Sequence, residues 1–353
     1  MNNQELQGRL LALYRQAGYV PYKMSKFEPY DLYVENRDFL LSEEIITFTG
    51  KSGRLLALKP DVTLSIVKGY RGGTSRVCYS ESVYRVPKGG DDFREITQAG
   101  LEYLGDVDDY VTAEVLILAL RSLAALGERA VLEVSHLGLL GELLSPFALS
   151  PTEKGEALSL IGERNAHGLT ALLSAHGDGE LAKKVSALLH LRTGAEGMLQ
   201  RIGELLPDSP TPARLCRILR AAEDVAPGAR VRFDLSVVSD LGYYSGTVFR
   251  GFTEGAPDAV LSGGEYSPLM KKMGKKAGAI GFAVYLDLVE KDARPGYDGD
   301  VFLRYREGAD VGALCRAAAR LAAEGRGVTV GRTLPEGQVF RRVVDFEEGT
   351  SKC

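Results

Sequence analysis

The chain has 353 residues, of which 45% are hydrophobic, 8% aromatic and 25% charged, the composition of an ordinary globular protein. This length suggests two domains, and the composition excludes collagen-like, coiled-coil and disulfide-scaffold proteins. Lys and Arg number 43 against 47 Asp and Glu, so the net charge is −4. That sign is wrong for a protein that grips a phosphate backbone over a broad face, and we expect no nucleic-acid partner.

The sequence indicates neither a membrane segment nor a metal site. It has no run of about 18 apolar residues, and its first fifteen residues have the pattern of an amphipathic helix rather than of a signal peptide. We therefore expect a cytoplasmic protein with no membrane partner. The four cysteines and four histidines lack metal-ligand spacing, so we expect reduced thiols, no metal and no cofactor. These residues are Cys78, Cys216, Cys315, Cys353, His136, His167, His176 and His190.

Two consecutive hairpins follow the N-terminal helix. The first joins residues 44–49 to 54–58, and the second joins 76–85 to 93–104 across a turn-rich segment. Short runs of branched and apolar residues on both sides of glycine-rich turns are typical of antiparallel strands. The two hairpins in series predict an antiparallel sheet.

The middle of the chain alternates between sheet and helix. Residues 109–126 have helical periodicity and 129–134 read as a strand. Leucine- and alanine-rich helical segments then fill 138–225, which we interpret as an insertion between sheet segments. Strands resume over 230–252, and 278–290 is predicted as a helix that begins at glycine.

The last part of the sequence predicts a small α/β module. Residues 300–305, 327–331 and 339–346 read as strands, and 309–324 as a helix. We place the domain boundary in the preceding linker, so that residues 1–295 form the core and 296–353 the C-terminal module.

One candidate site lies on the second hairpin. Side chains alternate along a strand, so Gln98, Gly100 and Glu102 share one face. An amide and a carboxylate with a glycine between them suit the ammonium group of a small ligand. The alternative is a solvated outer sheet face that binds nothing, and spacing alone favours it.

Two tyrosines form a second candidate. Tyr243 and Tyr244 precede Gly246 in the stretch read as strands. They form either a polar-tipped aromatic platform or simple packing, and spacing alone favours packing.

Taken in order, these clusters resemble the catalytic core of class II aminoacyl-tRNA synthetases, in particular the histidyl enzyme and its relatives, from about residue 5 to 290. Residues 58–63 (LKPDVT) resemble the segment that faces the substrate ammonium, and 79–104 resemble the long class II hairpin. Residues 240–248 and 263–266 (GGEY) resemble the two histidine-specific segments. Residues 278–289 resemble the closing class II motif, a glycine-rich strand-to-helix piece.

The resemblance implies an α+β fold, in which an antiparallel sheet is flanked by helices and carries a helical insertion and a shortened C-terminal module. It also implies a histidine pocket. Four residues would surround the ammonium, two tyrosines would contact the imidazole, and one arginine would remain as a cation. In that order they are Asp61, Thr63, Gln98 and Glu102; Tyr244 and Tyr266; and Arg85.

Three positions depart from the synthetase pattern. Ser239 stands where the family has an arginine that activates the substrate carboxylate, and Leu288 where it has an arginine against the ATP γ-phosphate. Pro87 replaces a glutamate at the adenine site. Each lost cation that served a developing charge costs about 10²–10³ in rate, so we expect no aminoacylation.

This combination resembles the synthetase-like regulatory subunits of ATP phosphoribosyltransferase, the first enzyme of histidine biosynthesis. The resemblance implies a non-catalytic subunit that binds the short catalytic subunit in a hetero-oligomer, supports its activity and mediates feedback with histidine as effector. It also implies a self-dimer through the N-terminal helix and first strands. Two alternatives stay open: a divergent histidyl-tRNA synthetase, and a synthetase-like paralogue that binds another ligand or protein.

Overall fold

The computed structural model describes residues 3–40, 44–86, 92–191, 193–238, 244–289, 297, 299–324 and 326–346. The chain separates into two compact units, residues 1–290 and 291–353. The expected boundary after residue 295 falls in 290–296, outside the described residues, and stays a prediction. No helix in the described ranges is long and apolar enough to cross a membrane.

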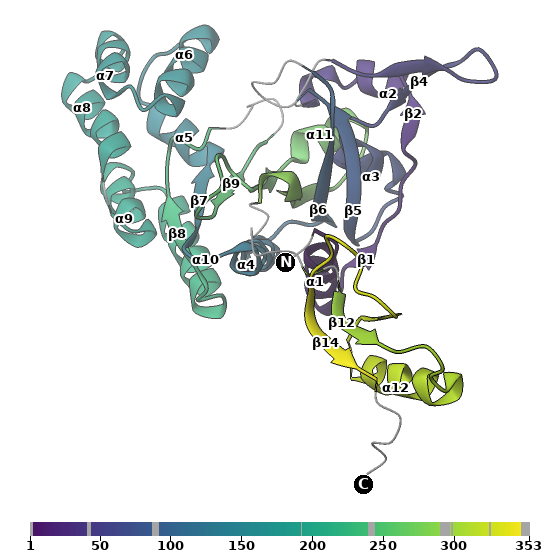
Figure 1. Cartoon of the computed structure of the whole chain (residues 1–353). Helices are drawn as coiled ribbons and strands as arrows, with labels where there is room; N and C mark the ends of the chain where they lie inside the picture. The colour runs from purple at the N-terminus through teal and green to yellow at the C-terminus, as the bar shows by residue number, and fades with distance from the viewer. Residues whose placement is uncertain are drawn as a thin grey trace. The chain divides into compact units, whose positions relative to one another are not determined.

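An eight-stranded sheet forms the centre of the first unit among the described residues (Figure 1). Its order is β1-β5-β6-β11-β10-β9-β7-β8, with the two outer pairs parallel and the other pairs antiparallel. The strands are β1 (Val20–Pro21), β5 (Ser75–Arg85), β6 (Arg94–Gly105), β7 (Ala130–His136), β8 (Ala229–Phe233), β9 (Thr247–Phe252), β10 (Leu261–Glu265) and β11 (Gly278–Tyr285). The second predicted hairpin is the β5–β6 pair.

One face of this sheet, the helix-covered face, carries the larger core. Leu101, Phe249 and Phe282 lie on it and are almost fully buried. It packs against α1 (Asn3–Gln16), α4 (Asp109–Leu126) and α10 (Thr211–Val225). Strand β8 alternates strictly, with Val231 buried on this face and Arg232 exposed on the other. The period of two therefore sends apolar side chains to the helices and polar ones to the opposite face.

The opposite face, the site face, is partly covered by a second, smaller core. A three-stranded sheet in the order β2-β4-β3 and two short helices supply it. These elements are β2 (Phe27–Pro29), β3 (Thr47–Thr49), β4 (Leu55–Leu58), α3 (Thr63–Gly69) and α11 (Ser267–Lys272), with α2 (Asp31–Val34) and the 3-10 turn Arg37–Phe39 between β2 and β3. The β3–β4 pair is the first predicted hairpin, closed by Gly50 N–H donating to the Arg54 carbonyl at 2.8 Å.

Helices α5 to α9 form one block beside β7 and β8 (Figure 1). Together with α10 they occupy the stretch interpreted as the helical insertion. They are α5 (Leu137–Leu144), α6 (Pro151–Gly162), α7 (Ala166–Ala175), α8 (Gly179–Ala187), the 3-10 turn Leu188–His190 and α9 (Ala195–Leu205). A capping box starts α6, in which the Ser150 hydroxyl accepts from the Glu153 N–H and the Glu153 carboxylate accepts from the Ser150 N–H.

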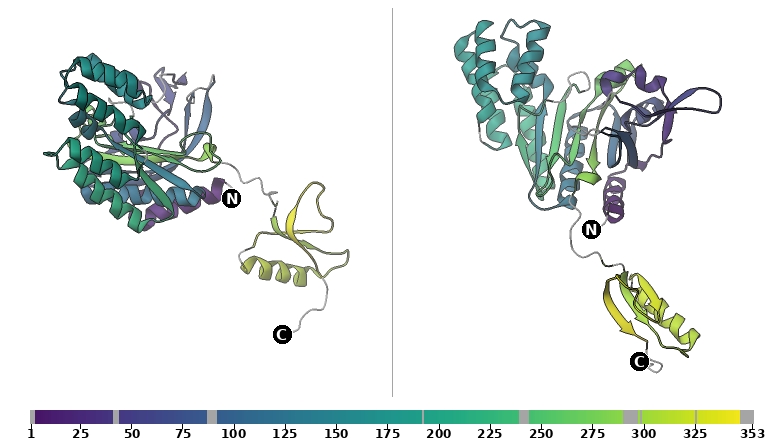
Figure 2. Two further views of the ribbon diagram at one scale, coloured as in Figure 1. Left: turned by 90° about the vertical axis from the view of Figure 1, so that its left-hand side faces the viewer. Right: turned by 45° about the horizontal axis from the view of Figure 1, so that its top comes forward.

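The C-terminal unit is a small parallel sheet with one described helix along one side (Figure 2). The strand order is β13-β12-β14. Its elements are β12 (Gly299–Arg304), α12 (Val311–Ala323), β13 (Val328–Gly331) and β14 (Phe340–Asp345). Asp310 caps α12 by accepting from Ala313 N–H at 2.6 Å.

One expectation about secondary structure is wrong. Residues 278–285 are strand β11, followed by a 3-10 turn over Leu286–Leu288, and not a helix. Strand β11 is central and mostly buried, so its apolar run lacks the alternation that separates a strand from a buried helix. The strands expected over 230–252 are confirmed as β8 and β9. After β8 the Asp234 carboxylate accepts from Ser236 N–H at 2.9 Å and turns the chain.

A charged cluster joins the segment between α1 and β1, strand β5 and helix α4. Arg76 on β5 donates to both carboxylate oxygens of Glu114 at 2.9 and 2.8 Å. Its guanidinium lies over the rings of Tyr19 and Tyr103, 5.6 and 5.4 Å from their centroids. The Tyr19 hydroxyl donates to Glu114 at 3.3 Å. This cluster ties three segments together that are far apart in the sequence.

We expect Arg76→Ala to lower the free energy of unfolding by about 2 kcal/mol, because it leaves a mostly buried carboxylate unpaired and removes two cation–π contacts. The control is Arg129→Ala, whose ion pair with Glu254 is 78% and 62% exposed and which should change stability by less than about 0.5 kcal/mol. Urea denaturation of both variants measures the difference. Equal effects would contradict the role given to the cluster.

Candidate functional site

The centre of the site is the carboxyl group of Glu102 on β6. Glu102 is only 2% exposed. Thr63 Oγ1 donates to its Oε1 at 2.9 Å, and the Tyr266 hydroxyl donates to its Oε2 at 2.8 Å. Both carboxyl oxygens therefore have partners from elements that cover the site face.

Local sequence explains how these three groups meet. Thr63 opens α3, and the preceding Asp61 accepts from Leu64 N–H at 2.8 Å, which fixes the start of that helix. Tyr266 directly precedes α11. On β11, Gly281 lies opposite Glu102, and a Cβ there would stand 1.8 Å from Glu102 Oε2. Only glycine leaves room for the acid at this point.

Burial controls the charge of these acids. It raises the pKa of Glu102 to about 8, against the lowering effect of the hydrogen bonds from Tyr266 and Thr63. Burial also raises the pKa of Asp61, while its backbone hydrogen bond from Leu64 and the Arg85 guanidinium act in the opposite direction. Glu102 therefore holds a proton at neutral pH when the pocket is empty.

Arg85 and a second cation lie beside this group. Arg85 is 7% exposed and its Nη1 donates to the Pro60 carbonyl at 3.3 Å. Lys59 has no exposed surface and pairs with Glu81 on β5. Sequence reasoning did not find the Lys59–Glu81 pair. Alternation along β5 places Glu81 on the same face as Tyr79 and Arg85, so the sequence did indicate that the Glu81 carboxylate lies on the site face.

A small pocket opens beside the Glu102 carboxyl group. Five of the seven predicted histidine-binding residues line it: Thr63, Gln98, Glu102, Tyr244 and Tyr266. Asp61 and Arg85 are not among the lining residues. The prediction missed Tyr79, Ser262 and Tyr285, which also line the pocket. Ser262 and Tyr285 come from β10 and β11, which pair next to β6, so a correct sheet order would have pointed to them.

The pocket has a volume of about 40 Å³, close to the share of liquid volume of one water molecule. Ligand pockets usually measure about 300–1,000 Å³. An amino acid can therefore enter only when the side chains that bond across this space move apart. Three of the lining residues, Thr63, Tyr266 and Glu102, are joined by hydrogen bonds.

The structure shows whether the face of β6 that carries Gln98 and Glu102 is solvated, a question that residue spacing left open. Gln98 and Glu102 are 4% and 2% exposed, so the solvated-face interpretation is wrong, because α3 and α11 cover this part of the sheet. Leu288 lies in the 3-10 turn after β11 and packs against the larger core. Pro87, Ser239, Asp240 and Tyr243 lie outside the described residues.

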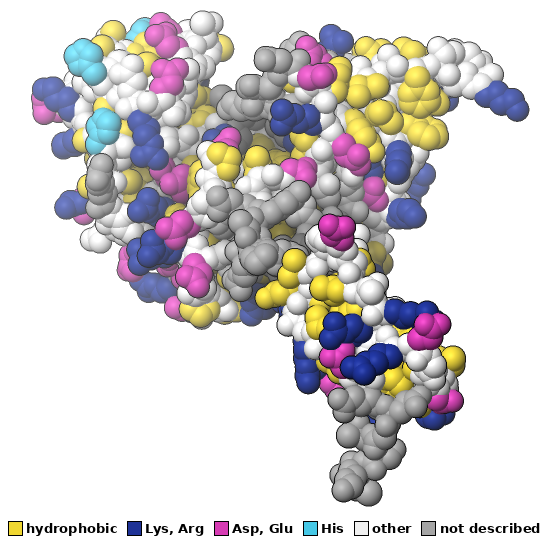
Figure 3. All heavy atoms as spheres, viewed as in Figure 1, with side chains coloured by type: hydrophobic (Ala, Val, Ile, Leu, Met, Phe, Trp, Pro, Cys, Tyr) yellow, Lys and Arg dark blue, Asp and Glu magenta, His cyan; other side chains and the backbone are white. Residues whose placement is uncertain are grey.

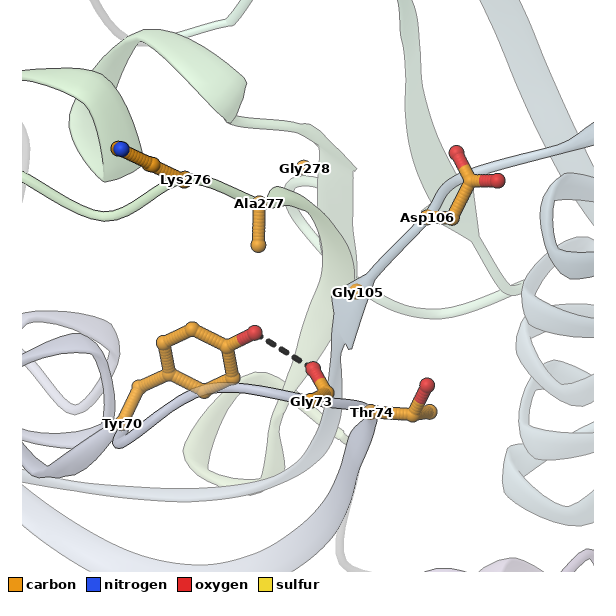
Figure 4. Close-up of a pocket in the computed structure, with 8 residues that line it drawn as sticks. All are labelled: Tyr70, Gly73, Thr74, Gly105, Asp106, Lys276, Ala277 and Gly278. Carbon is orange, nitrogen blue, oxygen red and sulfur yellow. Dashed lines mark hydrogen bonds between the residues drawn. The ribbon is translucent and has the colours of Figure 1, made fainter.

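A wider groove lies at the C-terminal end of β6 (Figure 4). It has a volume of about 520 Å³ and runs between Gly73 and Gly278 across Gly105. Lys276 and Asp106 extend away from each other there, and the Tyr70 hydroxyl donates to the Gly73 carbonyl at 2.5 Å. Because its charged groups do not converge, this groove is a poorer ligand site than the pocket. Among the described residues, no group of three His, Cys, Asp or Glu side chains is placed to hold a metal ion.

The fold and the pocket define a class II aminoacyl-tRNA synthetase core, which confirms the predicted fold class. A family model described as histidyl-tRNA synthetase matches residues 1–289, and the chain belongs to this family. The ATP phosphoribosyltransferase regulatory subunit of Acetivibrio thermocellus is 28% identical over 296 residues, which cover 80% of this chain and 71% of that protein. The predicted resemblance to such subunits is thereby confirmed.

Two solved structures share the fold. A Bacillus halodurans protein described as an ATP phosphoribosyltransferase regulatory subunit/histidyl-tRNA synthetase has a TM-score of 0.77 and 21% identity, covering 97% of this chain and 93% of that one. A chain of the ATP phosphoribosyl transferase complex from Thermotoga maritima has a TM-score of 0.64 and 18% identity, covering 81% and 97%.

The raised pKa of Glu102 predicts how stability depends on pH. The unfolded chain loses this proton near pH 4.5 and the folded chain near pH 8, so the folded state binds more protons in between. The stabilising contribution of this group to the free energy of unfolding is complete below pH 4.5. It is lost as pH rises toward 8, by at most about 1.4 kcal/mol per pH unit. Glu102→Gln should remove this slope.

Urea denaturation at pH 5, 6, 7 and 8 measures the effect. The control is Glu95→Gln, at the exposed end of the same strand, which should follow the wild type. If the wild type and Glu102→Gln ran parallel over this range, the buried acid would not titrate as we expect.

Proposed function

We propose that this chain is the regulatory subunit of ATP phosphoribosyltransferase. In this role it supports the short catalytic subunit and mediates feedback by histidine. The observation that carries the proposal is a buried pocket whose polar side chains suit the ammonium group of an amino acid. Glu102, Gln98 and Thr63 suit an ammonium group, while Leu288 packs on the core where a synthetase has its phosphate-binding arginine.

The comparisons support the same role. The Acetivibrio thermocellus relative is named a regulatory subunit of this enzyme, and a chain of the Thermotoga maritima complex shares the fold. We expect the catalytic subunit as the partner, histidine as the effector, and the cytoplasm as the location.

The closed pocket suggests how binding would be transmitted. A ligand must separate Thr63 and Tyr266 from Glu102, and these two residues begin α3 and precede α11. Both helices also carry residues of the smaller core. Occupancy would therefore shift a packed layer and not a single side chain, and a coupling of about 1–3 kcal/mol to the partner's active site is typical of such linkage.

The test is the rate of phosphoribosyl transfer from phosphoribosyl pyrophosphate to ATP by the short catalytic subunit of the same organism. It is measured with and without this chain, at zero and saturating histidine. We expect the rate to change on addition and to become histidine-sensitive only when both chains are present. An unchanged rate and unchanged inhibition, with the chain folded, would reject the proposal.

Within that assay, Glu102→Gln should weaken histidine binding about 10- to 100-fold at pH 8, since a charged hydrogen bond contributes about 1.5–3 kcal/mol. Feedback should weaken in parallel. Isothermal titration calorimetry gives the affinity, and Glu95→Gln is the matched control. Unchanged binding and feedback in Glu102→Gln would mean that the effector binds elsewhere.

The family match also favours one other activity, a divergent histidyl-tRNA synthetase. Histidine-dependent exchange between ATP and pyrophosphate separates the two functions, because only a synthetase forms the adenylate. Robust exchange by this chain would establish the synthetase and reject the regulatory subunit.

A self-dimer is also part of the proposal, and a surface patch supports it. The outer face of the small sheet leaves Phe27 47% and Phe48 39% exposed, with their ring centroids 5.6 Å apart, and the register places Leu56 of β4 on the same face. Hydrophobic side chains gather over β2 and β4 in the space-filling view (Figure 3). Exposed aromatic patches of this kind are typical of protein interfaces, and the first strands are where the resemblance implies dimer contacts.

We expect the wild type to sediment as a dimer and the double variant Phe27→Arg/Phe48→Arg to sediment as a folded monomer, because two buried charges cannot be accommodated in an apolar interface. The control is Val311→Arg, which alters a more exposed apolar residue, 71% exposed, in the C-terminal unit. Analytical ultracentrifugation distinguishes the species. A dimeric double variant would place the interface elsewhere.

A further inference from the structure

The pocket has a charged neighbour that the site has not used. Ser262 on β10 lines the pocket, and its partner across the strand pair is Arg250 on β9. Directly opposed residues of antiparallel strands lie on the same face with Cβ atoms about 4.5–5.5 Å apart. Arg250 is half-buried. Its side chain therefore rises from the site face one strand away from the pocket wall.

The next residue in the same cross-strand row is also small. Ala283 on β11 lies opposite Ser262 and also lines the pocket. The buried Tyr244 side chain forms a hydrogen bond with Ser262 and stands beside this row. An extended arginine spans more than the interstrand distance of about 4.8 Å, so the Arg250 guanidinium reaches the pocket past Ser262 once an entering ligand displaces Tyr244.

Arg250 is not needed to neutralise the acid on its other side. Glu133 on β7 lies opposite Arg250, but it also lies opposite Arg232 on β8. Among the described residues, neither arginine has a nitrogen within 4.0 Å of a Glu133 oxygen. Two arginines thus flank one carboxylate. The other acid nearby, Asp234, is already paired with Arg164.

Charges around Glu133 agree with this count. Burial is the largest cause that raises the pKa of Glu133, and the Asp234 carboxylate raises it further. The guanidinium groups of Arg164, Arg232 and Arg250 lower it. This part of the site face therefore carries more cationic than anionic groups.

We propose that Arg250 binds the carboxylate of the amino acid that occupies the pocket. The inference rests on the proposed function and adds a residue to its site. Groups suited to the ammonium, on α3 and β6, lie on one side of the pocket, and Arg250 lies on the other side across β11 and β10. The planar fork of a guanidinium matches a carboxylate with two hydrogen bonds.

This assignment would compensate for the arginine that the synthetase pattern has at position 239 and this sequence lacks. The synthetase resemblance expects the carboxylate-binding arginine where this sequence has Ser239, and Arg250 supplies a cation from a neighbouring strand instead. It also sets the ligand class: free α-amino acids, in preference to the corresponding amines or esters.

The test compares histidine with histidine methyl ester, in which the carboxylate charge is absent, by isothermal titration calorimetry at pH 8. We expect Arg250→Gln to weaken histidine binding about 10- to 100-fold and to leave binding of the methyl ester unchanged. Arg250→Lys, which keeps the charge but loses the fork, should fall between the two. Arg232→Gln is the matched control on the same face and should bind both ligands as the wild type does.

Each outcome bears on a different claim. Equal histidine binding by wild type and Arg250→Gln, with the wild type clearly binding, would overturn the role of Arg250 and leave the proposed function intact. An equal loss for histidine and its ester in a folded Arg250→Gln would mean that the residue shapes the pocket and does not bind the carboxylate. Absence of histidine binding to the wild type would overturn the proposed function and this inference with it.

Discussion

The rest of the site depends on one interaction, the burial of the Glu102 carboxyl group between two hydroxyls. A buried acid is costly unless its oxygens have hydrogen-bond partners. Thr63 and Tyr266 supply those partners from segments 39 residues before and 164 residues after it. Satisfying one carboxyl group therefore fixes where α3 and α11 lie on the sheet, and with them the walls of the pocket.

The same arrangement bears on the proposal that this synthetase fold binds an amino acid without activating it. In that proposal the acid on β6, with the space left by Gly281, recognises the ammonium group. Activation of a carboxylate needs separately placed cations, and Leu288, at a position where the synthetase resemblance expects one, packs against the hydrophobic core. The residues proposed for recognition and the position expected for activation thus lie on different segments of the chain.

The sequence predicted those parts of the fold in which apolar residues recur with a regular spacing within one segment. Both early hairpins and the shared face of Gln98 and Glu102 follow from alternation within one segment. Strand β11 was misread because it is buried on both faces and its pattern matches that of a buried helix. The pair of Lys59 with Glu81 depends on how the segment after β4 packs on β5, and the place of Arg250 beside Ser262 depends on register between strands. Neither is encoded by a single segment. Most of the site came from the family resemblance and not from spacing.

The contact between Gly281 and Glu102 has a consequence for how this family can vary. A methyl group at position 281 would stand 1.8 Å from the Glu102 carboxylate. The Leu101 carbonyl oxygen would stand 2.4 Å from the same methyl group, and this backbone atom stays in place whatever side chain occupies position 102. Glycine at position 281 is therefore required by the strand pairing itself, and the acid occupies space that the backbone already keeps open, so a family alignment should show glycine here even in members whose residue 102 varies.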